Sequence, residues 1–341
     1  MGGLRLMKPR EDAPVSENVT MTPEQATAYA ETFGRLVDNV ERVIIGKTFV
    51  VRLAFVAMLS EGHLLLEDYP GTGKTSLARA VAQSVHGSVS RIQFTPDLLP
   101  GDITGVSVFD QRSGDFAFHP GPIFASIVLA DEINRASPKT QAALLEVMEE
   151  HQVTVDGVAH RVPTPFLVIA TQNPIEQAGT YRLPEAQLDR FLLKASMGYP
   201  DHAATLRILD GADVSTHDII LEPVADQETV QRLISGARTV HVDPSIADYI
   251  ARLVEATRTA AETRLGASVR AAVALLRASR TLAAASGRHY VLPDDVKSLA
   301  ESVLAHRLVL DAEAEFDGVT ASSVVSQILL EIPPPNDRTA R

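Results

Sequence analysis

The stretch LLLEDYPGTGKTSLARA, Leu64 to Ala80, decides the fold. Its centre follows the G-x-x-x-x-G-K-[ST] pattern of a phosphate-binding loop, although Asp68 stands where that pattern has its first glycine. A nucleotide's phosphates need several backbone N–H groups aimed at one point, and small residues such as Gly71 and Gly73 let the chain curl closely enough. Asp68 lies at the strand end farthest from the phosphates, where Asp can adopt many of the backbone angles of glycine. We therefore interpret it as a tolerated departure from the pattern.

The residues after the second glycine carry groups suited to a nucleotide. Lys74 is a point charge for the β and γ phosphates, and Thr75 offers a hydroxyl to Mg²⁺ while opening a helix whose N-terminus also favours anions. The apolar run at 63–67 predicts a buried strand before the loop, and helical spacing predicts a helix after it. This context disfavours the alternative of a plain Gly/Pro turn that binds nothing. The residues predicted to bind the nucleotide here are Pro70, Gly71, Thr72, Gly73, Lys74, Thr75 and Ser76.

The whole chain has the composition of a globular protein with room for about two domains of ~150 residues. It has 341 residues, of which 45% are hydrophobic, and a net charge of −12. This acidic balance disfavours a protein that holds nucleic acid through a broad basic surface, so no nucleic-acid partner is expected. The chain has no cysteine, its N-terminus lacks the apolar core of a signal peptide, and no run reaches the ~18 apolar residues of a membrane span. We expect a cytoplasmic protein without a membrane span.

Short apolar runs alternate with helical patterns up to about Pro200, which is typical of a parallel sheet with helices on both faces. A capped helix is predicted after Thr22, and beyond Pro200 only helical patterns remain. The predicted strands lie at 63–67, 88–94, 126–132, 164–172 and 191–197, and two hairpins turn near Gly114 and at Asp156-Gly157. The predicted organisation is a disordered tail at 1–19, an α/β nucleotide-binding domain at 20–200, a smaller helical domain at 201–332 and a disordered tail at 333–341.

Polar side chains follow two further predicted strands, at the edge where parallel sheets bind their ligands. Asp131 and Glu132 end the run SIVLADE, and Asn173 follows the run FLVIATQ. Asp131 would hold the Mg²⁺ shell, Glu132 would polarise an attacking water, and Asn173 would orient that water or contact the γ-phosphate. Two acids at a strand end are common and Asn-Pro is an ordinary turn signal, but their order after a phosphate-binding loop favours a catalytic set.

In the order and length of its motifs the chain resembles the AAA+ ATPases, and within them the MoxR family. The resemblance spans roughly Thr22 to Ile332 and rests on GHLLLEDYPGTGKTSLA, RIQFTPDLLPGDITG, GPIFASIVLADEINRASPKTQAALLEVMEE, ATQNP, GTYRLPEAQLDRF and GASVRA. It implies an AAA+ P-loop NTPase core, with a parallel sheet and flanking helices, followed by a smaller all-helical lid domain. It also implies that the two hairpins lie near the pore of a ring.

The resemblance assigns roles to three polar residues outside the loop. Asn173 matches sensor 1, and Arg190 matches the arginine finger that reaches a neighbouring subunit's nucleotide. Arg270 in GASVRA matches sensor 2, which projects from the lid toward the γ-phosphate, although Val269 stands where the family often has proline. From its sequence context alone, Arg190 is equally typical of a solvated side chain or of an ion-pair partner of Asp189.

A fourth segment, ERVIIGK, is similar to the family's adenine-side segment. The similarity implies that Val43, Ile45 and Gly46 lie near the base. Apolar residues at these positions are equally typical of a protein core.

The resemblance implies a ring-forming, Mg²⁺-dependent ATPase that hydrolyses ATP to remodel, mature or assist metal insertion into partner proteins. It implies a homo-oligomer in the form of a hexameric ring, with ATP and Mg²⁺ as cofactors and a partner that carries a von Willebrand factor A domain. A finger that serves the neighbour's nucleotide requires this assembly. A metal-chelatase subunit, a DNA motor and a nucleotide-gated scaffold remain alternatives. The acidic charge disfavours the motor, and a scaffold that works by occupancy would not need Glu132.

Overall fold

The computed structural model describes residues 20–68, 71–112, 114–173, 181, 183–210 and 220–335. The predicted tail at 1–19, residues 336–341 of the second predicted tail, and Pro70 lie outside these ranges. Within the ranges, no helix combines the length and the apolar character needed to cross a membrane.

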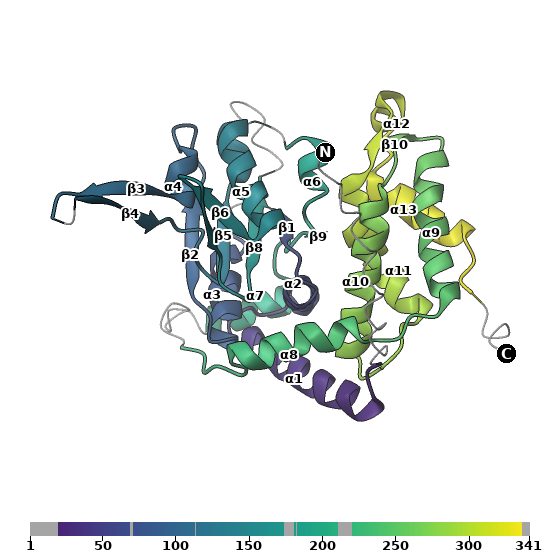
Figure 1. Cartoon of the computed structure of the whole chain (residues 1–341). Helices are drawn as coiled ribbons and strands as arrows, with labels where there is room; N and C mark the ends of the chain where they lie inside the picture. The colour runs from purple at the N-terminus through teal and green to yellow at the C-terminus, as the bar shows by residue number, and fades with distance from the viewer. Residues whose placement is uncertain are drawn as a thin grey trace, which may run out of the picture.

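A five-stranded parallel sheet forms the centre of the first part of the chain, and it confirms the five predicted strands (Figure 1). In spatial order its strands are β2 (Val89–Gln93), β5 (Ile127–Asp131), β8 (Leu167–Gln172), β1 (Leu64–Glu67) and β9 (Leu193–Ala195). Successive side chains of a strand point to opposite faces. Leu64 and Leu66 accordingly pack in one buried cluster, and Leu65 packs in a second cluster. Since the strands run parallel, the residues that follow β1, β5 and β8 share one edge of the sheet.

Helices cover both faces of this sheet. The first cluster takes in residues of α1 (Pro23–Glu41), α2 (Thr48–Leu59) and α3 (Lys74–Ser84), and the second takes in α4 (Pro100–Thr104) and α5 (Pro138–Glu150). α1 begins as predicted, because Thr22 Oγ1 accepts from Gln25 N at 3.3 Å and Gln25 Oε1 accepts from Thr22 N at 2.9 Å. Three short elements complete this part, namely η1 (Ile133–Arg135), α6 (Glu185–Leu188) and α7 (His202–Asp210).

Both predicted hairpins are present. β3 (Gly105–Asp110) pairs with β4 (Asp115–Pro120), and β6 (Gln152–Val155) pairs with β7 (Val158–Arg161). Asp156 and Gly157 both have positive φ, as a two-residue hairpin turn requires. Figure 1 shows β3 and β4 projecting from the sheet on the side away from the C-terminal helices. The Phe118 ring of β4 stacks on the His160 ring of β7 at 4.0 Å, so the two hairpins are in contact.

Within residues 220–335 the chain forms the expected helical lid, which packs beside α1 and α2 (Figure 1). Its helices are α8 (Gln227–Arg238), α9 (Pro244–Thr259), α10 (Val269–Ala285), α11 (Pro293–Leu304), η2 (Ala305–Arg307), α12 (Ala312–Phe316) and α13 (Ala321–Glu331). The expectation that strands stop at Pro200 needs a correction. β10 (Thr263–Leu265) and β11 (Val309–Leu310) form a short antiparallel pair, which satisfies backbone groups in two connections between helices.

Candidate functional site

The carboxyl edge of the sheet carries a cavity of about 240 Å³, which we call the phosphate-loop crevice. It brings together most of the residues that the sequence predicts for a nucleotide site, from segments around 71, 131 and 173. Its lining consists of Asp68, Gly71, Thr72, Gly73, Lys74, Thr75, Arg91, Gln93, Asp131, Glu132, Thr171 and Asn173. Ser76 lies one residue farther along α3 and does not line the crevice.

The loop has the backbone conformation that glycine permits. Gly71 and Gly73 have φ values of +81° and +90°, in the left-handed region. Among the described residues, a Cβ atom on Gly71 would meet nothing within 4 Å, and one on Gly73 would meet only Met197 Cε at 3.9 Å. Conformation rather than space therefore requires glycine here. Lys74 begins α3, and its Nζ donates to the carbonyl oxygen of Asp68 at 3.1 Å.

The side-chain contacts of Asp68, and not the glycine-like backbone angles inferred from the sequence, explain why an aspartate stands at the start of the loop. Asp68 does not share the positive φ that glycine would supply, and its side chain is buried, with 2% exposed. Its carboxylate accepts hydrogen bonds from Ser196 Oγ at 2.9 Å, Met197 N at 2.5 Å and Gly198 N at 2.9 Å. Asp68 thus ties the start of the loop to the segment that leaves β9, a contact 128 residues away in sequence.

Asp131 is held at the carboxyl end of β5 by two neighbours that the sequence analysis missed. Arg91 Nη2 forms an ion pair with Asp131 Oδ2 at 2.6 Å. Thr171 of β8 donates its hydroxyl hydrogen to Asp131 Oδ1 at 2.6 Å. Both partners come from strands that flank β5 in the sheet, so only the strand order could have identified them.

Glu132 follows in the left-handed conformation, with φ of +59°. Its backbone N–H donates to Thr171 Oγ1 at 2.9 Å. Its carboxylate oxygen Oε2 accepts from Gln93 Nε2 at 2.9 Å and from Arg135 Nη1 at 2.8 Å. The positive φ turns the side chain out of the line of β5 and into the crevice. A positive φ is unfavourable for a residue other than glycine, and such angles are typical of functional positions.

The crevice fits a magnesium ion in the chemistry of its donors. Thr75 supplies a hydroxyl oxygen and Asp131 a carboxylate oxygen, and both residues line the same cavity. Mg²⁺ prefers such hard oxygen ligands and usually takes few of them from the protein, with phosphate oxygens and waters completing its shell.

Arg190 and Arg270 lie at the opposite edge of the sheet. Arg190 Nη2 pairs with Glu149 Oε2 at 3.2 Å, and Arg270 Nη2 pairs with Glu149 Oε1 at 2.8 Å. Glu149 is near the end of α5, where the carbonyl oxygen of its neighbour Met148 bonds to His63 Nε2 at 3.1 Å. His63 directly precedes β1, whereas the phosphate loop follows β1. The two arginines are therefore separated from the phosphate loop of their own chain by the length of a strand.

Asp189 is not the ion-pair partner of its sequence neighbour Arg190. Its Oδ1 pairs with Arg307 Nε at 2.7 Å, and its Oδ2 accepts from Ser268 Oγ at 3.1 Å. Both contacts join the α/β part of the chain to the lid.

Val269 is the first residue of α10 and is exposed. Proline is favoured at the first position of a helix because a backbone N–H there has no partner within the helix. Valine at this position does not disturb the helix, so Arg270 remains in its first turn.

The predicted adenine-side residues precede α2. Val43 and Ile45 are half-buried, and Val43 packs against the first hydrophobic cluster. Gly46 has φ of +74°, and a Cβ atom there would lie 2.9 Å from Ala204 Cβ of α7. None of the three lines the phosphate-loop crevice. Their contact with a base stays a prediction.

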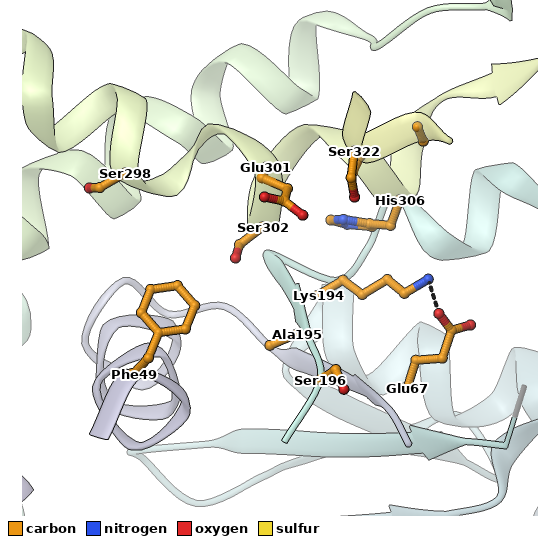
Figure 2. A pocket seen from close by; sticks show the side chains of 12 residues that line it. Phe49, Glu67, Lys194, Ala195, Ser196, Ser298, Glu301, Ser302, His306 and Ser322 are labelled. Carbon is orange, nitrogen blue, oxygen red and sulfur yellow. Dashed lines mark ion pairs between the residues drawn. The ribbon is translucent and has the colours of Figure 1, made fainter. Parts of the chain in front are cut away.

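A larger cavity, of about 430 Å³, lies between the core and the lid (Figure 2). Phe49, Lys194 and Ser196 reach it from the core, and Glu301 and His306 reach it from the lid. Its floor contains the ion pair of Lys194 with Glu67 at 2.7 Å. The volume exceeds that of the phosphate-loop crevice, but the glycine loop and the Asp131–Glu132 pair belong to the smaller cavity, so we assign the chemistry there.

Comparison with known families matches both parts of the chain. Residues 63–193 match the family described as "ATPase family associated with various cellular activities (AAA)", and residues 255–328 match the "AAA lid domain". Together the two matches cover strands β1 to β8 with the phosphate loop and most of the C-terminal helices.

Individual relatives match over nearly their full length. The chain is 47% identical over 307 residues to the Bacillus subtilis protein YeaC, which is uncharacterized, covering 90% of this chain and 96% of that protein. It is 39% identical over 337 residues to "Chaperone MoxR1" of Mycobacterium tuberculosis, covering 96% and 89%. A crystal structure of a candidate ATPase from Cytophaga hutchinsonii superposes with a TM-score of 0.86 at 36% identity, covering 92% of this chain and 98% of that one.

Proposed function

Because the chain belongs to the MoxR family of AAA+ ATPases, we propose that it binds ATP in the phosphate-loop crevice, hydrolyses it with Mg²⁺, and uses the hydrolysis to remodel partner proteins. One observation carries the proposal. The crevice gathers Lys74, Asp131, Glu132 and Asn173 from three strand ends into one cavity. These are the charge, the metal ligand, the base and the water-orienting amide that phosphoryl transfer needs.

Each side chain has a distinct part in the reaction. The backbone N–H groups of Gly71 to Thr75 and the Lys74 ammonium hold the phosphates. Bound Mg²⁺ would neutralise charge on the β and γ phosphates, with Thr75 and Asp131 as its protein ligands. Glu132 orients the attacking water and draws its proton, and Asn173 fixes the position of that water. The hydrogen bonds of Glu132 with Gln93 and Arg135 both fall on its Oε2 atom, so its carboxylate can still accept from the water.

The arginines complete the site of a neighbouring copy. Arg190 and Arg270 meet at the sheet edge opposite their own phosphate loop, so they serve a nucleotide that a second copy of the chain carries. An arginine supplied in this way contributes about 10³- to 10⁵-fold in rate. We propose a hexameric ring in which each ATP lies between the crevice of one copy and the two arginines of the next.

The physiological role is proposed from the relatives. The name of the Mycobacterium tuberculosis relative, a chaperone, supports remodelling or maturation of other proteins, with metal insertion as one form of it. We propose a cytoplasmic site of action and a partner with a von Willebrand factor A domain. Copurification of the ATP-loaded Glu132→Gln protein from cell extract tests the partner, because a hydrolysis-deficient ring retains its client.

The decisive test of the shared site mixes two inactive proteins, Arg190→Ala and Glu132→Gln. At some interfaces the first provides an intact crevice and the second provides intact arginines, so part of the ATPase activity should return. If subunit exchange is verified and the mixture stays inactive at every ratio, the shared site is wrong. A client assay in which Glu132→Gln retains full function would instead indicate a scaffold that works by nucleotide occupancy.

A further inference from the structure

One carboxylate joins the two arginines. Arg190 belongs to the core, two residues after α6, and Arg270 belongs to the first turn of lid helix α10. Both place an Nη2 atom on Glu149, one on each carboxylate oxygen, at 3.2 and 2.8 Å. Glu149 and Arg270 are 121 residues apart in the chain, so the arrangement is a product of the way the lid docks on the core.

The bonding leaves most of each guanidinium available. A guanidinium group has five N–H donors in a planar fork, and each arginine uses its Nη2 toward Glu149. The other donors can therefore bind a second anion while the carboxylate fixes the orientation of the fork. Two cations that must act on one phosphate also repel each other, and a carboxylate between them reduces this repulsion at the required separation.

We propose that Glu149 is a positioning residue, which holds Arg190 and Arg270 as one two-arginine unit for the γ-phosphate carried by a second copy of this chain. The proposal rests on the shared site described above. Glu149 does not touch the phosphate in this arrangement. It acts through the two arginines. Without its ion pair to Glu149, the side chain of Arg270 at the lid surface would lose its orientation toward Arg190.

A merely structural role does not account for these contacts. The side chains of Arg190, Glu149 and Arg270 are 30%, 38% and 54% exposed, and ion pairs at such exposure contribute little to folding. Docking of the lid is provided elsewhere. Arg307, with a side chain only 3% exposed, pairs with Asp189 and donates to the carbonyl oxygen of Phe191 at 2.6 Å, and a shared hydrophobic cluster joins the lid to α1 and α2.

The test compares Glu149→Ala with Glu146→Ala. Glu146 is an exposed residue one turn earlier on α5, and it forms no ion pair with the part of the chain described here, so it is the matched control. Glu149→Ala should lower kcat for ATP by about 10- to 100-fold, the usual cost of misplacing catalytic groups, and leave the affinity of the crevice for ATP unchanged. Glu146→Ala should retain wild-type kcat. Adding Glu149→Ala to Arg190→Ala should cause little further loss, because the two changes disable one unit.

Mixing experiments assign the defect to one half of the site. Glu149→Ala mixed with Glu132→Gln should regain activity, because the first protein has an intact crevice and the second has intact arginines. Glu149→Ala mixed with Arg190→Ala should not, because every interface then lacks a competent arginine pair. Glu149→Gln keeps an acceptor oxygen without the charge and should give an intermediate kcat. It replaces the alanine variant in the mixtures if circular dichroism shows that Glu149→Ala is unfolded.

The outcomes separate this inference from the proposed function. If Arg190→Ala and Glu132→Gln do not complement each other, the shared site itself fails. If they do, but Glu149→Ala keeps wild-type kcat or restores activity to Arg190→Ala, Glu149 does not position the arginines and the shared site stands. A Glu149→Ala protein that loses ATP affinity in proportion to kcat likewise overturns the positioning role.

Discussion

The buried carboxylate of Asp68 accepts a hydrogen bond from the backbone N–H of Met197 at 2.5 Å. Two further bonds, from Ser196 Oγ and Gly198 N, complete its shell. Because Lys74 donates to the carbonyl oxygen of the same aspartate, the phosphate-binding lysine and the segment after β9 are linked through one residue.

Replacing Asp68 with the glycine of the common loop pattern should therefore destabilise the protein. Asp68→Gly leaves the buried N–H of Met197 and the N–H of Gly198 without their acceptor, which should lower the free energy of unfolding by about 2 kcal/mol. Asp68→Asn keeps one acceptor oxygen, so its free energy of unfolding should lie between those of the wild type and of Asp68→Gly. Urea denaturation measures all three proteins. An Asp68→Gly protein as stable as the wild type would show that the contact is dispensable.

Binding and hydrolysis should separate between Lys74 and Glu132. Lys74→Ala removes the charge on the ground-state phosphates and should weaken ATP binding. Glu132→Gln should bind ATP like the wild type and lose about 10²- to 10⁴-fold in kcat, the usual contribution of a general base. Titration with a fluorescent ATP analogue and phosphate-release assays give the two quantities. Near-normal hydrolysis by Glu132→Gln would exclude Glu132 as the base.

Arg91 should compete with the metal for Asp131. Its ion pair at 2.6 Å occupies Oδ2 of the proposed ligand, and the arginine is half-exposed. Since an exposed pair contributes up to ~1 kcal/mol, Arg91→Ala should lower the Mg²⁺ concentration for half-maximal ATPase activity by about two- to fivefold. Arg232→Ala removes an exposed arginine from α8 and is the control. An unchanged or higher Mg²⁺ requirement in Arg91→Ala contradicts the competition.

Acid should destabilise the fold through His63. Burial lowers the pKa of this imidazole, the hydrogen bond to the carbonyl oxygen of Met148 raises it in part, and the nearby charges of His151 and Arg277 lower it, so that the resulting pKa is about 4. Between pH ~6.5 and 4 the unfolded chain binds a proton at this residue that the folded chain does not, so stability falls as the pH falls through that window. The loss should be on the order of 3 kcal/mol.

Urea denaturation from pH 7 to 4 checks this prediction. Burial also lowers the pKa of His306 well below its ordinary value, so His63→Gln should remove part of the pH dependence and leave the contribution of His306. His202→Gln, at an exposed histidine, should leave the pH dependence unchanged. If His63→Gln keeps the full wild-type slope, His63 does not carry it.

The sequence by itself determined the central sheet and the residues of the phosphate-loop crevice. The continuous apolar runs at β1, β5 and β8 predicted buried parallel strands, because a strand covered on both faces needs apolar residues at every position. Parallel strands end at one edge, so Lys74, Asp131, Glu132 and Asn173 had to meet there. Each of these inferences uses neighbours within a few residues, and such local patterns are visible in a single chain.

Only the tertiary structure decided which distant groups meet. Strand order places Arg91 and Thr171 beside Asp131, and docking of the lid brings Arg270 to Glu149 rather than to the phosphate loop of its own chain. The same holds for Asp68 and Met197, 129 residues apart. The sequence around a charged residue looks the same whether its side chain contacts water or a side chain from a distant part of the chain. Its contact is fixed by how helices and strands pack, and that packing depends on the summed burial of residues from the whole chain.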